Sequence, residues 1–327
     1  MACEPSREQV PSNDGTANGH AGWRIAATVA LLATLAWFLD TKAVATALAG
    51  ADALPILAAL LLVQAQIVLS AWRWRLIAER LGLRLPLGLA VGEYYVASLL
   101  NLVLPGGVPG DALRAVRLAK AAAAPAWRPV VRSIILERAA GQMALAGVMV
   151  VGFAAWPLVL EGRVPDEAAW LGVGVLVAGC VIALMLAILA RGGPAAMRSA
   201  VAGLGVDLFR ALAADGAWLT QGILNLAIVA SYVAAFALAA AALGHPVPWV
   251  GWFTVVPVVL FSMIVPVTIG GWGVREAIAA SLWPLLGLDP TIGFATSVLY
   301  GLIAVIGSLP GAAFLVFRLR GDARPAI

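Results

Sequence analysis

The sequence predicts an all-α polytopic membrane protein with six transmembrane helices and two re-entrant helical hairpins in a 3+3 inverted repeat. Composition gives the class: 62% of the 327 residues are hydrophobic and 12% are charged, whereas about a quarter of the residues in a soluble domain are charged. Two further observations give the arrangement. The apolar stretches are long enough to cross a bilayer, and two of them break at proline and glycine in matching places.

Six apolar stretches reach or approach the roughly 17 residues that a helix needs to cross the hydrocarbon core. They are residues 23–39, 54–72, 133–156, 168–190, 218–243 and 291–317. Two shorter apolar pieces, residues 86–104 and 249–269, run instead into segments rich in proline and glycine. We interpret these two pieces as the descending arms of re-entrant hairpins.

Each shorter piece ends in a break, after which a new helical pattern begins with a carboxylate and an arginine. The break residues are Pro105, Gly106, Gly107 and Gly110 in the first piece, and Pro266, Gly270, Gly271 and Gly273 in the second. In hydrocarbon an interrupted backbone leaves polar groups unpaired at several kcal/mol each, so breaks persist where they line a polar cavity or are buried in protein. Paired breaks in two halves of a chain are typical of a transporter's binding site.

The order span, span, broken hairpin, span occurs twice along the chain. Three crossings per half invert the second half, so the hairpins are expected to enter from opposite sides and their tips to meet near the bilayer midplane. The predicted parts are a disordered cytoplasmic tail (1–22), a first repeat (23–190) with its hairpin at about 86–120, a cytoplasmic linker (191–217), a second repeat (218–320) with its hairpin at about 249–288, and a cytoplasmic tail (321–327).

Basic residues gather in alternate loops. One set consists of Arg73, Arg75, Arg80, Arg84, Lys120, Arg128, Arg132, Arg191, Arg198, Arg210, Arg318, Arg320 and Arg324. The intervening loops hold only Lys42 and Arg163, beside five acidic residues. The positive-inside rule then places both termini in the cytoplasm. A signal peptide over residues 25–39 is the alternative, but its removal would destroy the repeat. This distribution is more informative than the net charge of +4, and no nucleic-acid partner is expected.

Ionisable side chains at membrane depth are candidates for function, because each costs at least about 2.5 kcal/mol at a helix centre unless it is paired or wetted. Those in this chain are Glu93, Asp111, Arg114, Glu137, Arg138, Arg275 and Glu276, and Asn101 adds a polar group near the first tip. A helix that restarts after glycines presents free N–H groups and the positive end of its dipole, which together bind anions. The guanidinium fork matches phosphate in shape, so Arg114, Arg138 and Arg275 are predicted to hold an anionic lipid headgroup.

Structural roles are the alternative for several of these residues. Asp111 fits the N-cap of the restarting helix. Glu137 and Arg138 fit an ion-pair network between hairpin and span, and Arg114 fits an anchor at the inner surface. Trp74, together with five other tryptophans, fits the interfacial belt.

No enzyme and no cofactor are expected. The two cysteines and two histidines, Cys3, Cys180, His20 and His245, are isolated from one another, so neither a metal site nor a disulfide framework is predicted. No Ser-His arrangement or active thiol is visible either.

The motifs together resemble one known family. Trp72-Arg73-Trp74, Asn101 with Leu104-Pro105-Gly106, Gly110-Asp111 with Arg114, Glu137-Arg138, and Pro266 with Gly270 to Glu276 resemble the lysylphosphatidylglycerol synthase transmembrane-region family, also called the flippase-like domain family. The resemblance runs from about residue 23 to residue 320. One departure is Pro109, which precedes Gly110-Asp111 where the family pattern has glycine, and which removes one backbone donor.

The resemblance implies a multi-pass protein of the bacterial inner membrane that moves lipids between leaflets. The lipids implied are phospholipid, aminoacylated phosphatidylglycerol, and polyprenyl-linked or hopanoid-related lipids. Larger members carry a fused cytosolic aminoacyl-transferase domain, which these 327 residues do not contain.

The function predicted first is therefore translocation of an anionic or phosphate-bearing lipid. No ATP-binding loop is visible, so the movement is expected to be downhill or coupled to a proton or ion gradient. The alternatives are a secondary transporter of a small anionic solute and a non-catalytic membrane partner of a lipid-modifying enzyme.

Overall fold

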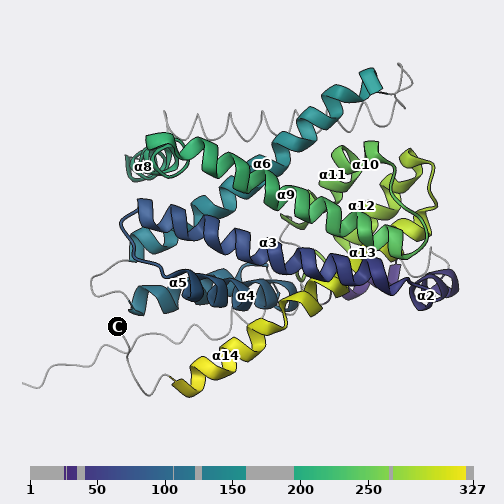
Figure 1. Ribbon diagram of the computed structural model, residues 1–327, viewed down its shortest axis with the longest axis horizontal. Helices are drawn as coiled ribbons and strands as arrows, with labels where there is room; N and C mark the ends of the chain where they lie inside the picture. Colours follow the sequence, from purple (N-terminus) through teal and green to yellow (C-terminus); the bar gives the residue numbers. More distant parts are fainter. Residues whose placement is uncertain are drawn as a thin grey trace, which may run out of the picture.

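The computed structural model describes residues 26, 28–34, 41–105, 107–121, 127–159, 195–264 and 268–321, and all of the named elements in these ranges are helices (Figure 1). The α-helices are α2 (Thr41–Ala49), α3 (Ala53–Arg80), α4 (Leu87–Val103), α5 (Pro109–Ala121), α6 (Trp127–Val159), α8 (Ala195–Leu212), α9 (Ala217–Ala242), α10 (Trp249–Phe253), α11 (Val255–Phe261), α12 (Val274–Leu282), α13 (Pro290–Ser308) and α14 (Pro310–Gly321). The all-α prediction is confirmed for this part of the chain.

Four helical segments in the described ranges are long and apolar enough to cross a membrane. They are Ala53–Arg80, Trp127–Ala155, Ala214–Ala242 and Pro290–Phe317, and they match the predicted spans 54–72, 133–156, 218–243 and 291–317. The predicted span 168–190 lies outside the described residues, and of 23–39 the structure describes residues 26 and 28–34. The two shorter apolar helical segments, Leu87–Val103 and Trp249–Ile264, match the predicted hairpin arms. The protein is therefore a multi-pass membrane protein.

Helices α3 and α9 pack side by side and run antiparallel through the middle of the molecule (Figure 1). The N–H of Asp52, before the start of α3, donates to the carbonyl of Ala242 at the end of α9 at 2.8 Å. At the other end, Arg80 Nη1 donates to the carbonyl of Ala214 at 2.7 Å. Because the two helices are long and apolar, their contact forms the central seam on which the other helices pack.

The same turn ends both of these helices. Gly82 after α3 and Gly244 after α9 have φ of 84° and 79°, a conformation that glycine adopts without steric cost. The next N–H in each turn donates back to the fifth-preceding carbonyl, Leu83 to Ala78 and His245 to Ala240, as in a Schellman cap. A proline then stands four residues after each glycine, as the N-cap of the shorter helix that follows.

The two breaks come together in space. The described residues between α4 and Pro109 are non-helical. After α11 a short 3₁₀ turn, Ser262–Ile264, comes before the second break, and α12 begins at Val274. Pro105 in the first break and Ile269 in the second form an isolated antiparallel β-bridge. A Cβ on Gly270 would lie 2.7 Å from the carbonyl oxygen of Leu102, so glycine is needed for this approach. The two breaks are therefore in contact. Their entry from opposite sides and their position at the bilayer midplane stay predictions.

Two further helices, α8 and α14, lie at the periphery of the part that the structure describes. Helix α8 lies in the predicted linker and is tied to α6 by the ion pair of Arg132 with Asp207 at 2.6 Å. Helix α14 follows α13 after a bend at Pro310 and packs on α4 (Figure 1), where Gly311 leaves room for the carbonyl of Tyr95. Proline at this position removes a backbone donor and bends the helix.

Candidate functional site

Asp111 is the centre of a group of polar contacts beside the first break. Helix α5 begins at Pro109, because proline's fixed φ and missing N–H suit the start of a helix. Asp111 therefore lies in the first turn of the helix and is not its N-cap. Its Oδ1 is 2.8 Å from Arg114 Nη2, its Oδ2 accepts a hydrogen bond from Asn101 Nδ2 at 3.2 Å, and Oδ2 also pairs with Arg138.

Asn101, near the end of α4, also binds the start of α5. Its Oδ1 accepts the N–H of Gly110 at 2.8 Å. Gly110 is needed here because a Cβ would lie 2.3 Å from the carbonyl oxygen of Ala97. At least one N–H that was predicted to bind an anion is thus used within the chain.

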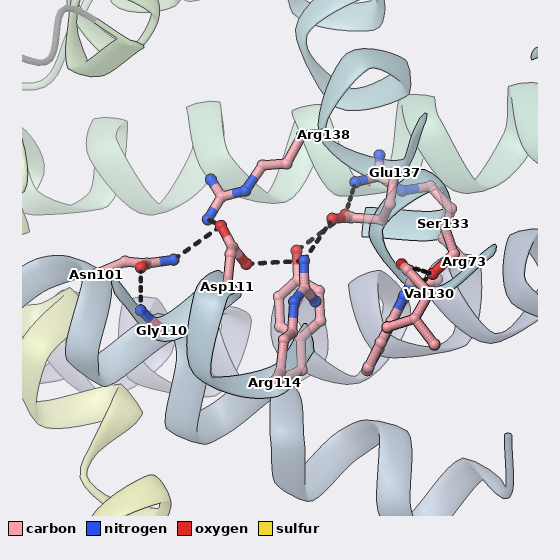
Figure 2. A network of polar contacts seen from close by, with 11 residues as sticks. Arg73, Asn101, Gly110, Asp111, Arg114, Val130, Ser133, Glu137 and Arg138 are labelled. Carbon is pink, nitrogen blue, oxygen red and sulfur yellow. Dashed lines mark hydrogen bonds and ion pairs between the residues drawn. The ribbon is translucent and has the colours of Figure 1, made fainter. Parts of the chain in front are cut away.

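Glu137 of α6 lies between two guanidinium groups. Its Oε2 is 3.2 Å from Arg114 Nη2, and its Oε1 pairs with Arg73 and accepts the hydroxyl of Tyr94 at 3.0 Å. The carboxylate is 1% exposed. Figure 2 shows Asp111 between Arg138 and Arg114, and Glu137 between Arg114 and Arg73.

Arg73 was not among the predicted site residues. The sequence placed it in a basic loop after a span ending at residue 72, but α3 continues to Arg80 and the side chain of Arg73 is buried. Its Nη1 donates to Asn225 Oδ1 on α9 at 2.6 Å. A Cβ on Gly141, one turn after Glu137, would lie 3.2 Å from its Nη2, so this glycine makes room for the guanidinium.

Arg114 is enclosed by aromatic rings. Its guanidinium carbon lies 4.5 Å from the ring centroid of Trp74 and 5.1 Å from that of Tyr94, distances typical of cation–π contacts. Trp74 is fully buried and donates to Ser133 Oγ at 3.1 Å, so its assignment to the interfacial belt is wrong. The Nε and Nη1 of Arg114 are buried and have no hydrogen-bond partner among the described residues.

The contacts join into a row of alternating charge, which we call the charged row. In order it contains Arg138, Asp111, Arg114, Glu137 and Arg73, and the neutral amide of Asn225 ends it. Three guanidinium groups and two carboxylates leave one positive charge in excess. Four of the five charged side chains are almost completely buried, whereas the side chain of Arg138 is 46% exposed. The excess charge is therefore accessible at Arg138.

Arg275 and Glu276, in the second half, form a separate and closed cluster. Arg275 Nη2 lies 2.5 Å from Glu276 Oε1, and its Nε donates to Ser297 Oγ at 2.9 Å. The guanidinium also packs against the rings of Trp272 and Tyr300 at 5.1 and 5.3 Å. Both charged residues are fully buried, and no ion pair joins them to the charged row within the described ranges.

The start of α12 is also satisfied internally. The N–H of Gly273 donates to Glu276 Oε2 at 2.5 Å, so this carboxylate forms a capping box with the backbone. Glycine is required at this position because its φ is 88°. At both helix starts, therefore, a backbone N–H donates to a side chain of the same protein and not to a ligand.

The remaining predicted residues lie at the margins. Glu93 of α4 is buried and pairs with Arg117 of α5 at 3.3 Å. Gly107, Gly270 and Gly271 have positive φ, as expected at breaks. The placement of Gly106 and Pro266 lies outside the described residues. No group of three or more metal-ligating side chains gathers within the part of the chain that the structure describes.

Comparison with known proteins agrees with this architecture. The described helices, with their charge-bearing breaks, define the general class of all-α multi-pass membrane proteins. More specifically, residues 23–311 match the family described as lysylphosphatidylglycerol synthase TM region, and the chain belongs to this family. A search of curated proteins found no match.

Proposed function

We propose that this protein is a lipid translocase that moves an anionic or phosphate-bearing lipid between the leaflets of the bacterial inner membrane. The observation that carries the proposal is the charged row: one excess positive charge, exposed at Arg138, beside a break in a membrane-depth helix. An isolated charge inside a bilayer is costly unless it has a partner. A phosphate that paired with Arg138 would supply that partner, and would itself be stabilised at membrane depth.

We further propose the 3+3 inverted repeat, with both termini in the cytoplasm and the hairpins re-entrant. The antiparallel packing of α3 and α9 supports opposite orientation of the halves, and the identical turns at Gly82 and Gly244 support a repeat. In transporters of this kind the substrate site lies at the interface of the repeats.

The proposed movement begins when a headgroup phosphate binds Arg138 and competes with Asp111 for its guanidinium. Asp111 keeps a second partner in Arg114, at 2.8 Å, so the carboxylate is not left unpaired when Arg138 turns to the lipid. The bridge between Pro105 and Ile269 would open as the halves rock, and the headgroup would pass between the breaks. This movement is downhill or coupled to a proton or ion gradient.

The first test is the substitution of Arg138. In proteoliposomes carrying a fluorescent phosphatidylglycerol, Arg138→Gln is expected to slow lipid movement by at least about tenfold, because a charge pair at contact distance near a protein surface is worth about 4 kcal/mol. Arg138→Lys keeps the charge but not the fork, and is expected to retain an intermediate rate.

Unchanged lipid movement in Arg138→Gln would contradict the proposal that Arg138 binds the headgroup. Uptake of inorganic phosphate by the wild type, without lipid movement, would instead favour a secondary transporter of small anions. Thermal unfolding of each variant in detergent controls for folding. Because Arg138 is the exposed end of the row, the melting temperature of the Arg138→Gln protein is expected to be close to that of the wild type.

A further inference from the structure

We infer that Asn225 sets the charge preference of this site, by leaving the charged row one negative charge short. The inference rests on the proposed translocation site and adds a specificity-determining residue to it. Asn225 belongs to α9, outside every break, and its side chain contacts Arg73. Within the described residues it forms no hydrogen bond with Arg138 or Asp111.

The position of Asn225 is the place where a carboxylate would close the row. Arg114 contacts a carboxylate on each side, Asp111 and Glu137, whereas Arg73 contacts a carboxylate, Glu137, on one side of the row. On its other side, Arg73 Nη1 donates to Asn225 Oδ1 at 2.6 Å. An aspartate has nearly the same shape as asparagine and would accept the same bond, but would add one negative charge.

The neutral amide has a consequence at the far end of the row. With a carboxylate at position 225, the row would contain equal numbers of positive and negative charges. Arg73 would share its attraction between position 225 and Glu137, so its interaction with Glu137 would weaken. Glu137 and Asp111 would then neutralise Arg114 and Arg138 more completely. With asparagine the row keeps a positive charge that neither of its own carboxylates balances, and Arg138 is the one exposed member of the row.

The preferred cargo is therefore a headgroup with a net charge of minus one, and a zwitterionic headgroup is disfavoured. In addition, α9 lies in the predicted second repeat whereas the charged side chains of the row come from α3, α5 and α6 in the first. The charge preference thus depends on a residue contributed by the opposite half.

The experiment compares phosphatidylglycerol, which carries one negative charge, with phosphatidylcholine, a zwitterion. Binding of each lipid to the full chain in nanodiscs and movement of each fluorescent analogue in proteoliposomes are measured for the wild type, Asn225→Asp and Asn225→Gln. In Asn225→Asp the added negative charge is expected to lower the preference for phosphatidylglycerol, measured as the ratio of its binding or movement to that of phosphatidylcholine, about tenfold. This magnitude assumes an effective dielectric constant of about 20 between the charges. Asn225→Gln keeps a neutral amide and is expected to keep the wild-type ratio.

Arg73→Gln gives the row the same net charge by removing a positive charge. It tests the role of charge if Asn225→Asp does not fold. It is expected to lower the ratio to a similar extent. An unchanged ratio in the folded charge variant would overturn the inference, and so would an equal loss in Asn225→Gln, which would indicate side-chain shape and not charge.

The two readouts separate this inference from the proposed function. If the wild type binds phosphatidylglycerol selectively and Asn225→Asp does not, but no lipid moves, then the specificity role stands and translocation is wrong. If lipids move but the ratio is insensitive to charge at position 225, then translocation stands and the role of Asn225 is wrong.

Discussion

Arg275 and Arg138 are both arginines that were predicted to hold a headgroup, but their surroundings differ. Arg275 is fully buried against Glu276, Ser297 and two aromatic rings. Even the opposite helix is adapted to it, because a Cβ on Gly301 would lie 2.4 Å from its Nη2. Arg138 is half-exposed. A ligand outside the protein could therefore contact Arg138 directly, whereas it could contact Arg275 only after internal contacts break.

We therefore expect Arg275→Gln to act mainly on stability. Removing one partner of a buried ion pair leaves the other charge unpaired and costs about 3–5 kcal/mol. Thermal unfolding in detergent should show a lower melting temperature for Arg275→Gln, with partial recovery in Arg275→Gln/Glu276→Gln, which leaves no unpaired charge. If Arg275→Gln melts like the wild type but moves no lipid, then Arg275 is a ligand and the cluster is not merely structural.

At this scale the sequence located most of the charged row but missed the end formed by Arg73 and Asn225. Asp111, Arg114, Glu137 and Arg138 were predicted because charge is rare at membrane depth. Arg73 was missed because its span was ended at the first arginine, although α3 continues through it.

Asn225 was noticeable only as one polar residue among several in an apolar helix. Its partner lies 152 residues away in the sequence. Pairing of that kind depends on how α3 packs against α9, which no local pattern contains.

Among the helices, the contact between α4 and α5 depends on a missing side chain. We expect Gly110→Ala to destabilise the protein by about 1–3 kcal/mol, the usual cost of overpacking, because the added carbon would meet the carbonyl of Ala97 at 2.3 Å. Gly222→Ala on α9 is the matched control, since nothing lies within 4 Å of its Cβ. Equal melting temperatures for the two variants in detergent would contradict the close approach.

The start of α13 gives a pH-dependent prediction. Asp289 caps this helix and accepts the N–H of Thr291 at 2.7 Å. Hydrogen bonds from the side chain and then the backbone of Thr291 lower the pKa of the Asp289 carboxyl. Its stabilisation is therefore complete above the ordinary carboxyl pKa and is lost as the pH falls through the lowered value.

Asp289→Ala should cost about 1 kcal/mol at neutral pH, the typical loss of an N-cap, and less in acid. Asp289→Asn should keep most of the cap at both pH values, because the amide does not titrate in this range. Melting temperatures of the three proteins at neutral and acidic pH test this, and a constant difference between wild type and Asp289→Asn would contradict the assigned pKa shift.

For the molecule as a whole, the sequence predicted the order of elements better than their internal contacts. The four described spans and the two shorter apolar helices lie where hydropathy placed them, because span length follows directly from bilayer thickness. The bends within them, such as the break between α13 and α14 at Pro310, follow from local chemistry. Composition could not predict the hydrogen-bond partners of the two helix starts. The N–H groups of Gly110 and Gly273 were predicted to face a ligand, but they donate to Asn101 and Glu276.

The proposed lipid movement depends on the contact between the two breaks. Residues paired across an antiparallel bridge have Cα atoms about 4.5–5.5 Å apart, a separation that a disulfide can span. Pro105→Cys with Ile269→Cys, in a chain whose Cys3 and Cys180 are replaced by serine, would therefore lock the bridge observed here.

The most direct measurement is lipid movement by this double-cysteine protein in proteoliposomes, before and after oxidation, with each single-cysteine variant as control. We predict that the disulfide forms, that phosphatidylglycerol movement stops, and that a reductant restores it. Failure of the disulfide to form, or an unchanged rate of lipid movement in the linked protein, would contradict passage of the headgroup between the two breaks.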